Sequence, residues 1–316
     1  MHQNPSDQSG YREIREFLKE EWPQRLLEIP QPPKKLFIRG SFPSNQNEDG
    51  NKSLASKNPS QDLKFLCVVG SRKFTSYGKE ACEHLIKNLR GWPIVIVSGL
   101  AFGIDSIAHE AALEVGLQTI AIPGSGLSDK VLYPRNHFHL AQNILKNGGA
   151  LISEYEDDFR ATPWSFPQRN RIMVGISHAI LIIEASSKSG TMITARMAAD
   201  YNRDVLALPS SIFNQTSEGT HYLLKNGATP VRTAEDILEI LGFETSSDPI
   251  TLDIFKYISA LPPDEQTLII LLQREPATFS QLIENTTFSQ ALLNELLSSL
   301  EVKGLILREN IKFRLV

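Results

Sequence analysis

The chain has 316 residues, of which 41% are hydrophobic and 22% are charged, and its formal net charge is −4. This length allows two domains with substantial cores, and the composition is that of an ordinary soluble globular protein. The acidic balance argues against a broad basic face that coats duplex DNA, and no apolar run reaches the roughly 18 residues that span a membrane.

The first 62 residues are expected to form a short extension and a linker. The apolar spacing between residues 11 and 18 predicts a short helix. The sequence LFIRG at 36–40 is typical of an edge strand, and the composition of 41–62 is typical of a loop. The polar first ten residues do not resemble a signal peptide, which favours a cytoplasmic location.

Strand and helix signals alternate between residues 63 and 243. Strands are expected near residues 64–69, 93–97, 117–122, 149–152, 178–184 and 204–208. Helices are expected near residues 77–90, 104–115, 136–146, 168–176, 192–201, 217–226 and 233–241. This pattern predicts an α/β fold, a Rossmann-like parallel sheet with helices on both faces. Ligands of such sheets gather at the carboxyl ends of the strands.

A second domain is expected at residues 248–316, after the polar linker ETSSD at 244–248. Three helices are expected near 265–273, 279–284 and 289–303, followed by a hairpin with strands at 305–307 and 311–315. These elements together predict a small winged-helix domain. Its nine carboxylates and six Lys and Arg give a balance of −3, which favours a protein contact or a packing role over DNA reading.

Most of the candidate binding residues lie between Trp164 and Ala195. Arg169 and Arg171 belong to a stretch, residues 159–183, that has three arginines and no carboxylate. A guanidinium matches a phosphate, and the nearby ring of Phe166 can stack on a base. The arginines could instead cap helices or pair with a carboxylate of Glu154 or Glu184.

Other loops add possible phosphate contacts. The small polar loop at 186–191 opens into a helix, whose N-terminus suits an anion. The loop Gly70-Ser71-Arg72 offers backbone N–H groups and a guanidinium, and Gly99 permits close backbone approach. No GxGxxG or Walker pattern is present in these loops, so we expect no cofactor.

The histidines and cysteines indicate structural roles. Asp105 and His109 are four residues apart on an expected helix, which predicts a hydrogen bond between them. The seven histidines show no convincing metal spacing. Cys67 and Cys82 are expected to be free thiols.

The motifs Gly70-Ser71-Arg72, SGLAFGID at 98–105, FPQRNRI at 166–172 and SGT at 189–191 occur together in this order. With them the chain resembles the DNA-processing protein A family (DprA/Smf) over residues 22–241 and again at its C-terminal end. Phe102 departs from this family, which usually has an arginine there.

The resemblance implies a single-stranded DNA-binding accessory protein without enzymatic activity. Such a protein protects incoming DNA and helps to load a RecA-type recombinase in natural transformation and recombination, and the resemblance implies a homodimer. The expected nucleic-acid-binding residues are Gly70, Ser71, Arg72, Gly99, Phe166, Arg169, Asn170, Arg171, Ser189, Gly190 and Thr191.

Two alternatives use the same loops. One is a nucleotide-binding regulator that holds a single mononucleotide. The other is a phosphoribohydrolase-like enzyme, a class that carries a GTxxE motif with a catalytic glutamate. Here Thr194 stands where that glutamate would be.

Overall fold

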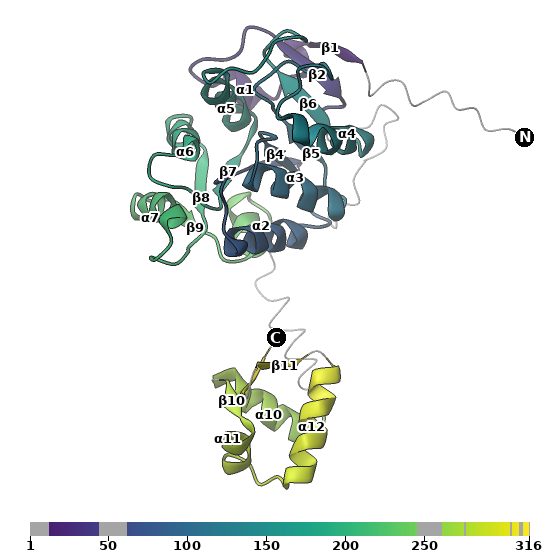
Figure 1. Ribbon diagram of the computed structural model, residues 1–316, viewed down its shortest axis with the longest axis vertical. Helices are drawn as coiled ribbons and strands as arrows, with labels where there is room; N and C mark the ends of the chain where they lie inside the picture. Colours follow the sequence, from purple (N-terminus) through teal and green to yellow (C-terminus); the bar gives the residue numbers. More distant parts are fainter. Residues whose placement is uncertain are drawn as a thin grey trace, which may run out of the picture. The chain divides into compact units, whose positions relative to one another are not determined.

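The fold is described from a computed structural model, in which the chain divides into two compact units, Met1–Glu244 and Thr245–Val316. Figure 1 shows the elements of both units. The structure describes residues 13–43, 62–244, 261–274, 276–303, 305–309 and 312–315. Most of the expected loop at 41–62 and of the expected linker at 244–248 lies outside these ranges.

The first unit is built on a sheet of nine described strands in the order β1-β2-β6-β5-β4-β3-β7-β8-β9. The strands are β1 (Ile14–Phe17), β2 (Leu36–Gly40), β3 (Lys64–Val69), β4 (Ile94–Ser98), β5 (Thr119–Ala121), β6 (Ala150–Ser153), β7 (Ala179–Ile182), β8 (Asp204–Ala207) and β9 (Thr229–Pro230). From β6 to β9 all neighbours pair in parallel. The central strands β3, β4 and β7 are almost entirely apolar, as expected for strands covered on both faces of the sheet. The expected parallel α/β class is confirmed.

Helices cover both faces of this sheet (Figure 1). The helices α1 (Gln24–Leu27), α5 (Ser165–Ile176), α6 (Gly190–Asp200) and α7 (Glu218–Lys225) pack on one face. The helices α2 (Ser76–Asn88), α3 (Ile104–Glu114), α4 (Phe138–Lys146) and α8 (Ala234–Ile240) pack on the other. Short 3₁₀ turns lie at η2 (Lys19–Glu21), η3 (Arg135–His137) and η4 (Gln215–Ser217).

Two expectations for the N-terminal extension were wrong. Residues 14–17 form the antiparallel strand β1 rather than part of a helix, because they pair with β2. The segment LFIRG is a strand, β2, but it does not lie at the edge of the sheet. It pairs with β1 on one side and with β6 on the other, so its backbone groups are satisfied on both sides.

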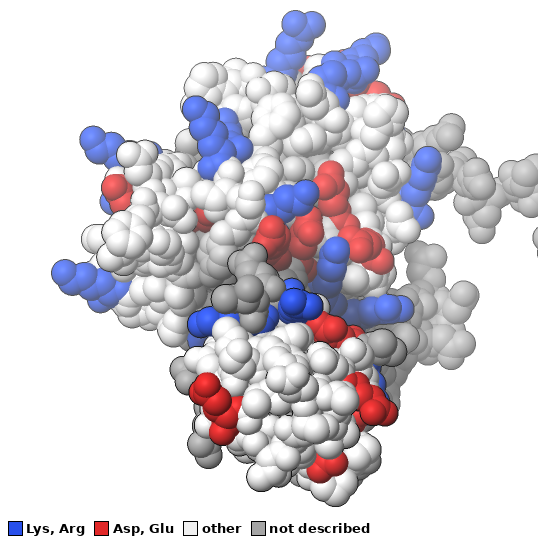
Figure 2. Space-filling view, turned by 60° about the horizontal axis from the view of Figure 1, so that its bottom comes forward, with Lys and Arg blue, Asp and Glu red and all other residues white. Residues whose placement is uncertain are grey.

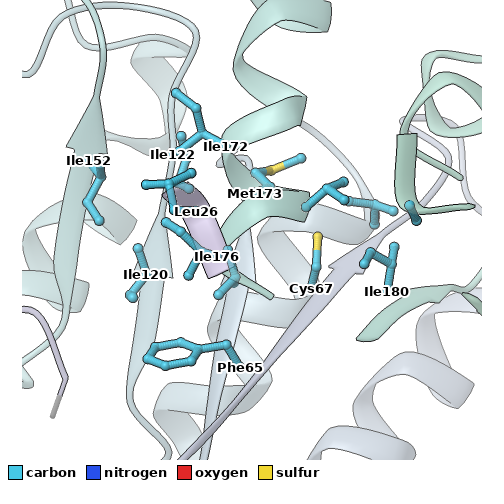
Figure 3. Close-up of a cluster of buried hydrophobic side chains, with 14 of the residues drawn as sticks. Leu26, Phe65, Cys67, Ile120, Ile122, Ile152, Ile172, Met173, Ile176 and Ile180 are labelled. Atoms are coloured by element: carbon cyan, nitrogen blue, oxygen red, sulfur yellow. The ribbon is translucent and has the colours of Figure 1, made fainter. Parts of the chain in front are cut away.

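Helix α5 lies over the middle of the sheet. Figure 3 shows its side chains Ile172, Met173 and Ile176 in the same buried cluster as Cys67 of β3 and Ile180 of β7. Burial of each large apolar side chain contributes about 1.5–3 kcal/mol to stability. This packing fixes the helix that carries the predicted arginines.

The second unit contains α10 (Pro263–Arg274), α11 (Phe279–Glu284), α12 (Gln290–Val302), β10 (Ala277–Thr278), β11 (Ile306–Glu309) and β12 (Lys312–Leu315). The three strands form an antiparallel sheet in the order β10-β12-β11. Leu293 and Leu300 of α12 are fully buried in a core of their own unit. Helices and a hairpin occur in the expected order, and the assignment to the winged-helix class stays a prediction.

Candidate functional site

A pocket of about 790 Å³ lies at the carboxyl edge of the large sheet, where the loops after β3, β4, β6, β7 and β8 meet. Nine of the eleven residues predicted to bind nucleic acid line it: Gly70, Ser71, Arg72, Phe166, Arg169, Asn170, Ser189, Gly190 and Thr191. The other two, Gly99 and Arg171, are not part of the lining. The topology therefore brings together motifs that are more than a hundred residues apart in the chain.

The loop between β3 and α2 is held by hydrogen bonds at both ends. The Ser71 hydroxyl donates to the Lys73 carbonyl at 2.7 Å and accepts from the Lys73 N–H at 3.1 Å. The Thr75 N–H donates to a carboxylate oxygen of the buried Glu184 at 3.0 Å. This anchoring leaves the Arg72 side chain exposed at the pocket.

Arg72 and Phe166 form the mouth of the pocket. The Arg72 guanidinium carbon lies 5.4 Å from the centre of the Phe166 ring, within the range of a cation–π contact. Phe166 belongs to the first turn of α5, and a side chain on Gly124 would collide with its ring. The ring is half-buried, so one part of its surface stays available to a ligand.

Arg169 lies beneath this mouth and is only 4% exposed. Its Nη1 donates to the Ile122 carbonyl. Burial lowers the pKa of Arg169, and the nearby carboxylate of Asp105 opposes that shift. Burial also raises the pKa of Asp105, while the Arg169 guanidinium and the N–H groups of Gly99 and Ala101 act to lower it. Arg169 and Asp105 thus form a charge-balanced floor.

The opposite wall is the N-terminus of α6. Ser189 is the N-cap residue, but its side chain makes no capping hydrogen bond. The Thr191 hydroxyl donates to the Gly70 carbonyl at 3.1 Å, and the Asn170 amide donates to the Thr194 hydroxyl at 2.9 Å. These bonds tie α6 to the β3 loop and to α5. The helix N-terminus faces the pocket with a partial positive charge that suits an anion.

Gly99 and Arg171, the two predicted residues outside the lining, make contacts within the fold instead. The Gly99 N–H donates to Asp105 Oδ2 at 3.1 Å, behind the Arg169 side chain. Arg171 forms a buried ion pair with Glu154 and donates from Nη1 to the Gln31 carbonyl at 2.9 Å. The alternative expectation, an arginine paired with Glu154, is therefore confirmed for Arg171.

The expected hydrogen bond between Asp105 and His109 was wrong. The His109 Nδ1 atom lies 2.7 Å from the Thr119 hydroxyl, and His109 is fully buried. Burial lowers the pKa of His109 to about 3. Backbone N–H groups occupy the Asp105 carboxylate instead, because the glycine-rich turn before α3 brings them closer than the next helical turn.

Some lining residues were not singled out as binding residues from the sequence. They include Asp105, Pro163, Thr194 and Thr216. Asp105 is the last residue of the SGLAFGID motif and Thr194 follows the SGT motif by three residues, so their places could be inferred from the strand ends. Thr216 follows β8 in a loop without a motif, and nothing in its sequence marks it as part of a pocket.

Lys and Arg side chains stand as separate groups in Figure 2, with carboxylates between them, rather than as one continuous basic face. Within the described ranges, no cluster of three or more His, Cys, Asp or Glu side chains could hold a metal ion. No helix in these ranges is long and apolar enough to cross a membrane.

A family model described as DNA recombination-mediator protein A matches residues 13–242. The chain belongs to this family. The DNA processing protein DprA of Bacillus subtilis is 35% identical over 223 residues, which cover 70% of this chain and 68% of that protein. Protein Smf of Escherichia coli is 45% identical over 178 residues, 56% of this chain, and the match spans about half (47%) of its length.

Solved structures of DprA proteins share the fold. The DprA structure from Streptococcus pneumoniae has a TM-score of 0.61 and 34% identity, with 75% of this chain and 76% of that chain covered. The structure from Helicobacter pylori has a TM-score of 0.60 and 30% identity, with coverages of 73% and 97%. The latter is described as showing a unique single-stranded DNA binding mode.

Proposed function

We propose that this DprA-family protein binds single-stranded DNA in the pocket at the carboxyl edge of its large sheet. The observation that carries the proposal is the Arg72 guanidinium 5.4 Å from the Phe166 ring, at the mouth of a pocket whose far wall is the N-terminus of α6. The cation matches one phosphate of a strand, and the aromatic face matches a base. The helix N-terminus matches a second phosphate. The single-strand binding described for the H. pylori relative supports this.

The same arrangement favours a single strand over a duplex. Paired bases are stacked on their neighbours and cannot place a face on Phe166, whereas an unpaired base can. Duplex binding rests mainly on many phosphate contacts across a broad basic surface. The chain carries a net charge of −4, which disfavours that mode.

Arg72 rather than Arg169 is the expected phosphate contact. Arg72 is exposed, whereas Arg169 is buried beside Asp105 and bound to a backbone carbonyl. A buried guanidinium whose charge is already balanced gains little from a further anion. We assign to Arg169 the role of supporting the pocket floor.

The proposed role involves no reaction catalysed by the protein. In a phosphoribohydrolase-like enzyme the GTxxE glutamate would stand at position 194, and here the Thr194 hydroxyl accepts a hydrogen bond from Asn170. A regulator that binds one mononucleotide would use the same pocket, and the length of the ligand distinguishes it from a strand binder.

We further infer that the protein acts on DNA in the cytoplasm during natural transformation and recombination, as a homodimer that passes single strands to a RecA-type recombinase. The support is the family's description as a recombination mediator. A pull-down with purified recombinase and light scattering of the free protein test the two partners.

The test of the central proposal is fluorescence anisotropy with labelled oligo-dT, a blunt duplex of equal length and free mononucleotide. We expect affinity to rise from one nucleotide to about six, and tighter binding to oligo-dT than to the duplex. Equal affinity for oligo-dT and duplex would contradict the proposal. An affinity that does not grow with length would favour the mononucleotide regulator.

A further inference from the structure

Exposed aromatic side chains line the carboxyl edge of the large sheet. Seven aromatic residues are exposed among the described residues, and five of them lie in loops between the carboxyl end of a strand and the following helix. These five are Phe74 after β3 (42% exposed), Phe102 after β4 (41%), Tyr133 after β5 (45%), Trp164 after β6 (54%) and Phe213 after β8 (89%). We call these five residues the aromatic track.

The track is continuous with the pocket on both sides. The Tyr133 ring lies 5.7 Å from the ring of Phe166, which lines the pocket. Phe213 belongs to the β8–α7 loop, whose residue Thr216 also lines the pocket. In the strand order β5-β4-β3-β7-β8, four strand spacings, about 19 Å in all, separate the strands β5 and β8 that precede the loops of Tyr133 and Phe213.

Phe102 and Tyr133, in the loops after β4 and β5, are anchored by contacts within the protein. The Phe102 ring packs edge-on against His137 at 4.9 Å between centres, and His137 Nδ1 lies 2.7 Å from the Leu100 carbonyl. The Tyr133 N–H donates to the Ser125 hydroxyl at 3.2 Å. These contacts hold the Phe102 ring and the Tyr133 backbone in place at the surface.

The loop of Phe213 is fixed in the same way on the other side. The Tyr77 hydroxyl donates to the Pro209 carbonyl at 2.8 Å, and His221 Nε2 lies 2.9 Å from the Ser210 carbonyl. The Ala185 N–H donates to the Thr216 carbonyl at 2.8 Å. Both ends of the loop are therefore anchored, while Phe213 at its tip is the most exposed of the five rings.

Anchored, water-exposed aromatic rings suit a ligand with flat apolar faces. Unpaired bases have such faces, and stacking on aromatic side chains tolerates any sequence. A strand held in the pocket by Arg72 and Phe166 continues in both directions along this edge, so its next bases meet the track first. Resting on the proposed function, we propose that the aromatic track stacks on the bases that lie on both sides of the pocket.

The test compares wild type, Phe102→Ala, Phe213→Ala and the control Tyr222→Ala by anisotropy. Tyr222 is 55% exposed but lies in the second half of α7, outside the track. On oligo-dT of about 15 nucleotides, each track variant should bind about 5- to 150-fold more weakly than wild type, the usual effect of losing one stacked base. On a strand of about four nucleotides, which fills the pocket alone, all four proteins should bind alike.

A second arm replaces the outer bases of the long strand by abasic sites, which should abolish the difference between wild type and the track variants. Track variants that bind the long strand like wild type would overturn the track and leave the proposed function intact. The track is overturned in the same way if Phe213→Ala changes only the sedimentation of the protein, because the ring then contacts a second copy. A wild type that binds no oligo-dT would overturn the proposed function and the track with it.

Discussion

A side chain on Gly99 and the guanidinium of Arg169 would occupy the same space. Gly99 also donates its N–H to Asp105 Oδ2 at 3.1 Å, so the glycine, the buried carboxylate and the buried guanidinium form one packed unit beneath the pocket. Gly99 thus shapes the site without lining it.

Gly99→Ala should therefore displace Arg169 and disturb the pocket from below. We expect a stability loss of about 1–3 kcal/mol, as for other overpacked sites, and weaker binding of oligo-dT. Urea unfolding and anisotropy measure the two effects. Gly190→Ala is the matched stability control, because a Cβ there would meet no atom within 4 Å. Equal stability of the two variants would contradict the packing proposed here.

Removing one partner of the Arg171–Glu154 ion pair should destabilise the protein more than replacing both partners by apolar side chains. Its side chains are 9% and 11% exposed, so Arg171→Met leaves a buried carboxylate unpaired and should cost about 3–5 kcal/mol. The double variant Arg171→Met with Glu154→Leu should recover most of that loss, because it removes both buried charges. Urea unfolding of the two single variants and the double variant gives the coupling energy. Additive losses would show that the two side chains do not depend on each other.

The alternating pattern of the sequence predicted the parallel sheet, the helices on both faces and nine of the lining residues. It failed where a partner distant in the chain decides the structure. Ile14 and Phe17 have helical spacing, yet β2 offers this segment a backbone partner and it becomes a strand. Asp105 and His109 have the spacing of a helical pair, yet each forms its hydrogen bond elsewhere. Asp105 accepts from the Gly99 N–H, and His109 bonds with the Thr119 hydroxyl.

The dependence on partners distant in the chain also explains why Arg169 and Arg171 have different roles. Arg169 and Arg171 lie two residues apart on α5, so sequence alone treats them alike. Their positions on the helix direct one towards the pocket floor and the other towards Glu154 and the N-terminal extension. Only the packing of α5 on the sheet separates these roles.

Stability should fall as the solution is acidified, in part through His109. Its pKa is about 3 in the folded protein against 6.5 in the unfolded chain, so below about pH 6.5 only the unfolded state takes up the proton. Stability is then lost with a slope that approaches 1.4 kcal/mol per pH unit, until the pH nears about 3. Urea unfolding at several pH values should show a shallower slope for His109→Gln. His84→Gln, at an exposed histidine, should keep the wild-type slope, and a matching change in both variants would contradict this assignment.

A chain that ends at Glu244 should fold and bind oligo-dT within about threefold of the full chain. The first unit has its own cores, and the second has an acidic balance of −3 that adds nothing to phosphate binding. The cut must keep Phe243, which is 4% exposed and packs 5.3 Å from Trp92. A chain ending at Gly242 should consequently melt lower. A loss of more than about tenfold in affinity, roughly 1.4 kcal/mol, would show that the second unit contacts DNA.

The most direct test of the central claim is the salt dependence of oligo-dT binding by wild type, Arg72→Ala and Arg90→Ala. Arg90 is an exposed arginine just after α2, at the opposite edge of the sheet. If Arg72 binds a phosphate at the pocket mouth, Arg72→Ala should lose about 1.5–3 kcal/mol of binding free energy. The slope of log K against log salt should also become shallower by about 0.7, while Arg90→Ala keeps the wild-type affinity and slope. Wild-type affinity and slope in Arg72→Ala would contradict single-strand binding by this pocket.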